Sequence, residues 1–191
     1  MDYEASISLI RGQIRDISRF FRKIMGIRTI LFPVMKVLDR LETKFKDSLY
    51  VSVEEDENFE YREMATLKDE GNGVYCIRIK ESVYLGAIKG NRACLGFICH
   101  EMCHFVLVYI FGVGPKQFVS ADGIAYARAC ADGSLKPWKS MEWQAKALCG
   151  ETMIPYDRCK DMAFNQIIEK TMSSDEQTEY FLRKVVKRDQ Q

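Results

Sequence analysis

The pentapeptide His100-Glu101-Met102-Cys103-His104 constrains this chain more than any other part of its sequence. It lies within a long apolar stretch, residues 91–111, whose length and composition predict a buried helix. On a helix, residues four apart lie on one face about a turn from each other, so both imidazoles can bind the same metal ion. The chain has no other histidine, and in the H-E-x-x-H motif the glutamate is the general base that acts on water at the metal. The sequence therefore predicts His100 and His104 as zinc ligands and Glu101 as a catalytic base.

Two other interpretations of this stretch are open at this point. The two histidines could be solvated, or satisfied within the core, on a helix that binds no metal. The run from Ala93 to Val113 is also about as long as a membrane span, as in an intramembrane zinc protease. The next most apolar stretch, Ile30 to Leu38, is much shorter and contains a proline and a lysine. The pattern therefore favours the buried central helix of a soluble domain.

Composition narrows the class of protein and its partners. The chain of 191 residues, 47% hydrophobic and 29% charged, is long enough to bury a sizeable core, and we expect a single domain over residues 1–191. A formal net charge of +1 provides no field to attract nucleic acid or an anionic membrane, so neither is expected as a direct partner. Seven cysteines without C-x-x-C spacing, and no signal-peptide pattern before residue 20, favour free thiols in a reducing cytoplasm.

Periodic patterns before the central stretch predict further helices and a small sheet. Apolar residues at helical spacing, Ile10 among them, predict an amphipathic helix over residues 4–25 that ends near Gly26. A second helix is predicted over residues 34–46. Alternating apolar and polar residues predict strands at 48–53 and 74–79, with a third short strand around 60–67. The expected fold is α+β, with the central helix packed with further helices against a small, mainly antiparallel sheet.

The chain beyond the central stretch is predicted to be helical after an irregular segment. Residues 116–141 carry two Asp-Gly turns and are expected to form a wall or lid of the site. A helix is predicted at 141–155, where Pro155 ends it. Within the C-terminal helices, Ser174 is a predicted N-cap with Gln177 three residues on. The expected organisation is therefore N-terminal helices in 1–46, the sheet and the metal-site helices in 48–155, and C-terminal helices in 156–191.

A zinc site of this kind needs a third protein ligand, and the sequence limits the choice. Metzincins supply it as H-E-x-x-H-x-x-G-x-x-H, but Leu107 and Ile110 occupy the last two motif positions. SprT-like proteases resemble the pentapeptide but need another histidine downstream, and this chain has none. A carboxylate must therefore complete the site, and the best candidate is Glu142, at the start of the 141–155 helix. The alternative is that Glu142 is an exposed acidic residue favoured at a helix N-terminus.

Together, the two segments resemble the ImmA/IrrE family of zinc metallopeptidases. Members of this family carry HELGH on one helix and, further along, E-x-x-A-N-x-x-A followed by an apolar stretch ending in Met-Pro. Here HEMCH is followed by Glu142-Trp-Gln-Ala-Lys-Ala-Leu-Cys and then by Met153-Ile154-Pro155. The resemblance covers roughly residues 75–155 and implies a zinc-dependent endopeptidase that hydrolyses a peptide bond in a protein. Because family members commonly cleave a helix-turn-helix transcriptional repressor, in stress responses or mobile elements, it also implies a DNA-binding repressor as substrate.

The chain departs from the family pattern at three places. Cys103 replaces the glycine before the second histidine, and Gly96-Phe97 replaces Phe-Thr before the motif. Lys146 replaces the asparagine four residues after the ligand glutamate, where an amide could orient a ligand. At this spacing Lys146 is instead predicted to pair with the charge of Glu142.

Stabilising the oxyanion calls for a second donor, and with no histidine left the candidates are Tyr126 and Arg128, in the segment ahead of Glu142.

The alternative function is a non-catalytic regulatory or antitoxin-like binding protein on the same fold, in which any zinc is structural. The intact Glu101 argues against this alternative, since a structural site has no use for a base.

Overall fold

The computed structural model describes residues 4–114 and 137–187, and within them the predicted α+β class is confirmed. The elements of this part of the chain are, in order, α1 (Arg11–Ile24), α2 (Val34–Lys44), β1 (Leu49–Glu54), a 3-10 turn (Asp56–Asn58), β2 (Ala65–Gly71), β3 (Val74–Lys80), α3 (Glu81–Ile88), α4 (Arg92–Phe105), a π-helical turn (Val106–Ile110), a 3-10 turn (Pro137–Lys139), α6 (Met141–Met153), α7 (Tyr156–Cys159), α8 (Phe164–Thr171), α9 (Asp175–Tyr180) and a second π-helical turn (Phe181–Val186).

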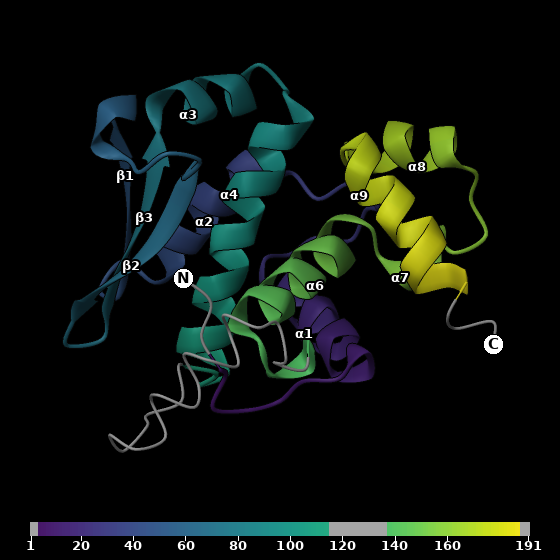
Figure 1. Ribbon diagram of the computed structural model, residues 1–191, viewed down its shortest axis with the longest axis horizontal. Coiled ribbons are helices and arrows are strands. Elements are labelled where there is room, and N and C mark those ends of the chain that lie inside the picture. Colours follow the sequence, from purple (N-terminus) through teal and green to yellow (C-terminus); the bar gives the residue numbers. More distant parts are fainter. Residues whose placement is uncertain (1–3, 115–136, 188–191) are drawn as a thin grey trace.

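α4 lies at the centre of the fold, as the apolar stretch predicted. The sheet and α2 lie on one side of this helix, while α6 and α1 lie on the other (Figure 1). Asn91 caps α4, because its side-chain oxygen accepts hydrogen bonds from the N–H groups of Ala93 (3.0 Å) and Cys94 (3.3 Å). Helical residues Arg92–Ile110 have a mean hydropathy of 1.7 and the length of a membrane span. Here they pack between the sheet and α6, which is the position of a core helix (Figure 1).

The sheet described here is mixed, in the order β1-β3-β2. Its middle strand, β3, has the buried residues Cys76, Ile77 and Ile79. β2 and β3 form an antiparallel hairpin, whose turn at Asn72 is flanked by two glycines with positive φ. β1 occupies the other side of β3 and runs parallel to it, so one of the two strand pairs differs from the mainly antiparallel expectation. The strands predicted at 48–53 and 74–79 are present, but the third begins five residues later than around 60, at Ala65.

The N-terminal helix begins at Arg11, so its predicted start near residue 4 is wrong. The preceding residues are held by backbone hydrogen bonds to distant segments: the Ala5 N–H donates to the Lys139 carbonyl (2.7 Å) and the Ser6 N–H to the Gly114 carbonyl (2.8 Å). These contacts hold the chain extended where its periodicity alone favoured a helix. Ile10, predicted to face the core, is 62% exposed as a result.

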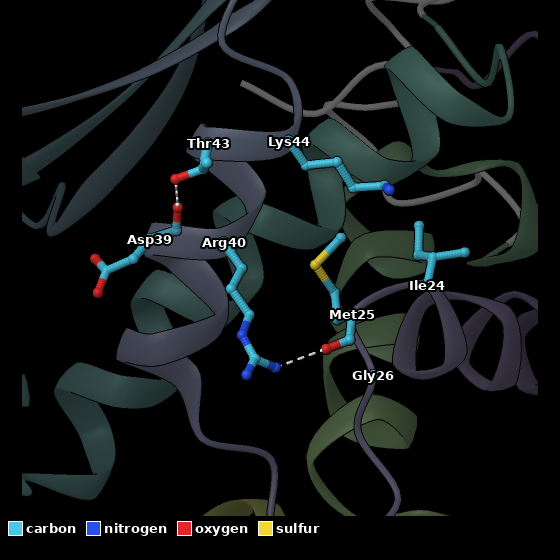
Figure 2. Close-up of a pocket in the computed structure, with 7 residues that line it drawn as sticks. All are labelled: Ile24, Met25, Gly26, Asp39, Arg40, Thr43 and Lys44. Carbon is cyan, nitrogen blue, oxygen red and sulfur yellow. Dashed lines mark hydrogen bonds between the residues drawn. The ribbon is translucent and has the colours of Figure 1, made fainter.

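A shallow hollow marks the junction between α1 and α2 (Figure 2). Gly26, with φ of 70°, ends the first helix as predicted. Arg40 on α2 donates a hydrogen bond from Nη1 to the carbonyl of Met25 (2.9 Å), which satisfies a group left open at the end of α1 (Figure 2). The hollow is distant in sequence from the H-E-x-x-H segment and contains neither histidine.

The C-terminal helices pack against α4 and α6. The predicted cap is confirmed, since the Gln177 N–H donates to the Ser174 hydroxyl (3.2 Å) at the start of α9. The side chain of Gln177 lies over Gly96 of α4, where an added Cβ would be 3.2 Å from Nε2. It also donates to the Met153 sulfur of α6 (3.6 Å). Gly96 therefore permits the close approach of α9, which gives this departure from the family pattern a structural reason.

Glu151 lies largely buried at the junction of α1, α6 and α7. One oxygen accepts a hydrogen bond from the Tyr156 N–H (2.8 Å), and the other is 3.6 Å from Nε of Arg15. The Arg15 guanidinium also stacks over the Tyr156 ring, 3.7 Å from its centre. Burial raises the pKa of Glu151 from 4.5 to about 7, although the Tyr156 N–H and the charge of Arg15 act in the opposite direction.

We predict that Glu151 makes the stability of the fold depend on pH. Because the folded-state pKa is raised, the stabilising contribution of this carboxyl is full below pH 4.5 and is lost as the pH rises through about 7. The loss should amount to roughly 3 kcal/mol. Urea unfolding of the wild type and of Glu151→Gln should show their stability difference falling by this amount over that range. The exposed control Glu169→Gln should show no such trend, and a pH-independent Glu151→Gln difference would contradict the assignment.

Candidate metal centre

His100 and His104 lie one turn apart on the face of α4 that meets α6. Their Nε2 atoms are 3.1 Å apart, and the two ring planes are nearly perpendicular, at 85°. Both side chains are largely buried, with exposed fractions of 18% and 13%. The prediction that the two imidazoles share a face and converge on one point is therefore confirmed.

The first turn of α6 places Glu142 beside the two histidines. Ser140 caps this helix by accepting a hydrogen bond from the Trp143 N–H (2.9 Å). Gln144, which is completely buried, donates through Nε2 to the carbonyls of Ile7 and Trp138, both at 2.9 Å. These bonds fix the first turn of α6, and with it the position of Glu142, to the extended N-terminal segment.

The geometry of the three side chains fits one metal ion. Glu142 Oε1 lies 3.1 Å from His104 Nε2, and Oε2 lies 3.4 Å from His100 Nε2. Ligands at about 2.0 to 2.1 Å from a tetrahedral Zn²⁺ lie about 3.3 Å from each other, so these donors need little movement to share an ion. Of the His, Cys, Asp and Glu side chains in the described part of the chain, these three form the group close enough to hold a metal. The cluster can therefore hold a metal ion, as the spacing of the two motifs predicted.

The side chains of the cluster shift the pKa values of Glu142 and His100 in opposite directions. Hydrogen bonds from His100 and then His104 place the pKa of Glu142 well below its ordinary range. Burial by itself lowers the pKa of His100, but the hydrogen bond to Glu142 and the charge of Glu101 outweigh it, so this pKa lies above 6.5. A divalent cation between these side chains would displace the protons that they bind. Metal binding should therefore release protons and weaken as the pH falls.

Glu101 is held beside the cluster by the edge of the sheet. Its Oε2 accepts a hydrogen bond from the backbone N–H of Leu67 in β2 (2.7 Å), while Oε1 lies 4.0 Å from His100 Nε2. The residue is 8% exposed, and burial raises the pKa of its carboxyl above 4.5, against the opposing charges of His100 and His104. One oxygen is thus anchored, and the other is directed to the metal cluster.

The neighbours of the ligands also bear on the sequence predictions. Cys99 and Cys103 are completely buried and lie outside the group of donors that can share an ion, as expected for packing residues. Lys146 Nζ lies 3.6 Å from Glu142 Oε2, so the predicted charge pair is confirmed. Tyr126 and Arg128, the candidate oxyanion donors, lie outside the described residues.

Sequence reasoning missed two groups that position the site. The buried amide of Gln144 was not assigned a role, although its place two residues after the candidate ligand in a capped helix was a usable signal. The backbone N–H of Leu67 has no sequence signal at all, because any residue except proline offers it.

No protein-family model, curated protein or solved structure matched the chain.

We predict that the metal-free protein binds one Zn²⁺ per chain and that His104→Ala weakens this binding by about 100-fold or more, because one of three ligands is lost. Glu142→Gln should weaken it as well, since a neutral amide replaces an anion. The measurement is competition of each protein with a chromophoric zinc chelator. The control is Cys149→Ala, which removes a buried thiol from the same helix as Glu142 and should leave affinity unchanged. Unchanged binding in His104→Ala, or loss in Cys149→Ala, would refute the ligand set.

Proposed function

We propose that the chain is a zinc-dependent endopeptidase that hydrolyses a peptide bond in a protein substrate. The observation that carries this proposal is the buried carboxylate of Glu101, anchored on one side and directed on the other to a group of three metal-binding side chains. The choice of zinc rests on the donor set of two imidazoles and one carboxylate, which is that of catalytic sites with an open position. The resemblance of the paired motifs to ImmA/IrrE peptidases points to the same reaction.

Each side chain has a defined task in this proposal. His100 and His104, through Nε2, and Glu142, through its carboxylate, would hold the ion. When bound, zinc polarises the scissile carbonyl and lowers the pKa of the attacking water. Oε1 of Glu101 takes the proton from that water and passes it to the leaving amine. Because Glu101 is only 8% exposed, a proton on its carboxyl has little access to bulk water and can pass to the amine.

The position of β2 favours a peptide as substrate. β2 lies at an edge of the sheet and reaches the metal centre through the Leu67 N–H. An extended peptide can add to such an edge by backbone hydrogen bonds, which would carry it past Glu101. The exposed fraction of Glu142, 36%, leaves the cluster accessible from outside.

The biological setting of the proposal comes from the family resemblance. It suggests a DNA-binding transcriptional repressor of the helix-turn-helix class as substrate, cleaved in the cytoplasm in a stress response or by a mobile element. The chain itself would make no direct contact with nucleic acid or membrane in this setting, consistent with its net charge of +1. The competing function, a non-catalytic binding protein with structural zinc, provides no reason to bury and orient Glu101 beside the ligands.

We predict that Glu101→Gln retains zinc and loses peptide hydrolysis, because an amide cannot take up the proton. The expected fall in kcat is about 10²-fold to 10⁴-fold. The measurement pairs elemental analysis of zinc with mass spectrometry of a digested peptide mixture. The matched control is Glu169→Gln, an exposed acid on α8, which should leave both properties unchanged. Equal hydrolysis by Glu101→Gln and wild type would exclude the proposed mechanism, and hydrolysis by neither would favour the binding protein.

A further inference from the structure

A cleft of about 550 Å³ opens beside the metal centre. Its walls come from α1, α4, α6 and the C-terminal helices from α9 onward, and His100 is one of the residues that line it. Of these, α1, α6 and α9 lie on the side of α4 that faces away from the sheet (Figure 1). The cleft therefore adjoins the metal centre at His100.

The cleft is lined largely by apolar and aromatic side chains. Phe97 lies on α4 one turn before His100, on the same face, and remains 42% exposed. Trp143 adjoins Glu142 on α6, and Tyr180 on α9 is 50% exposed. Large aromatic groups left exposed around a concave site next to a metal centre are typical of surfaces that bind an apolar group.

Basic side chains surround this apolar surface. Arg11, Arg15, Arg92 and Lys146 line the cleft, against two acidic residues that line it, Glu151 and Glu176. Arg11 contacts the Trp143 ring and the Tyr180 hydroxyl, and among the described residues it makes no ion pair with a carboxylate. Three of these basic groups pair with carboxylates: Arg15 with Glu151 (3.6 Å), Arg92 with Asp175 (4.0 Å) and Lys146 with Glu142 (3.6 Å). Among the described residues, Arg11 is therefore the one of the four whose charge is left uncompensated. It complements a ligand that carries negative charge.

Small residues in its walls keep the cleft open. Ala93, Ala147 and Gly150 are among its lining residues. A Cβ added at Gly150 would meet no atom within 4 Å, so the space beside this part of α6 is open. A large side chain can therefore enter without displacing the helices.

We propose that this cleft binds the substrate side chain next to the scissile bond, and that it selects a large apolar or aromatic side chain with acidic residues beside it. The inference rests on the proposed peptidase function and names its substrate preference. The aromatic walls bind the side chain, and Arg11 contacts the neighbouring carboxylates. A peptide with a small side chain would leave the cleft unfilled, and a basic neighbour would meet the basic rim.

Three labelled peptides with blocked ends test this preference on the zinc-loaded full chain. The first contains Phe flanked by Asp and Glu, the second replaces Phe by Ala, and the third replaces the two acids by Lys. Cleavage is measured as kcat/KM with the wild type, and binding as Kd by fluorescence anisotropy with Glu101→Gln. The first peptide should be favoured by about tenfold or more over each of the others. Its advantage over the third should shrink at high salt, because exposed charges are screened.

Substitution within the cleft gives the matched comparison. Gly150→Leu should fill the cleft and reduce the preference for Phe over Ala to about one, and Ala147→Leu is a second variant with the same expected effect. The control, Gly12→Leu, makes the same change in a helix, at an exposed glycine of α1 that also has open space around it and is outside the cleft. Zinc content of every variant shows whether the metal centre persists.

The outcomes separate this inference from the proposed function. Cleavage of all three peptides at equal rates would overturn the inference and leave the peptidase intact. If the first peptide binds selectively but is not cleaved, and Gly150→Leu abolishes this binding, the result supports the proposed role of the cleft. It also refutes the proposed peptidase function. Equal binding of the three peptides, or unchanged selectivity in both Gly150→Leu and Ala147→Leu, would overturn the assignment of the cleft.

Discussion

The packing of α6 against α4 is the contact on which the rest of the structure depends. It brings Glu142, on one helix, to within 3.1 Å of His104 on the other, although the two residues are 38 positions apart in the chain. Neither helix forms the site alone, since α4 offers two imidazoles and α6 one carboxylate. The alignment is held by groups far from the motif, above all Gln144, which ties the start of α6 to the N-terminal segment. A metal bound there would in turn join the two helices.

The same two helices also divide the surroundings of the site into two regions with different chemistry. On the sheet side, the edge strand β2 anchors Glu101 through the Leu67 N–H and offers backbone groups to an extended chain. On the opposite side, α6 and α9 enclose a cleft with apolar walls and a basic rim. In the proposed peptidase, an extended substrate would be held by its backbone on one side and distinguished by its side chain on the other. Catalysis and selectivity would then depend on separate residues, linked through His100.

Features that arise from local sequence patterns could be predicted, and those that depend on distant contacts could not. The central helix and the shared face of the two histidines follow from residues within one or two turns of each other. Glu142 was found by combining motif spacing with the coordination needs of zinc. The late start of α1 depends on hydrogen bonds from Ala5 and Ser6 to segments over 100 residues away, and periodicity carries no trace of them. The parallel pairing of β1 with β3 likewise joins segments that are distant in sequence, such as Leu49 and Tyr75, and the alternation within each strand does not specify it.

We propose that two imidazoles and one carboxylate bind a single zinc ion that no thiol touches. X-ray absorption at the zinc edge of the protein loaded with one equivalent of Zn²⁺ tests this most directly, because it distinguishes sulfur from lighter ligand atoms. The account predicts only nitrogen and oxygen ligands at about 2.0 to 2.2 Å, with the signature of two imidazoles. A sulfur shell at about 2.3 Å would place a cysteine in the coordination sphere and contradict it.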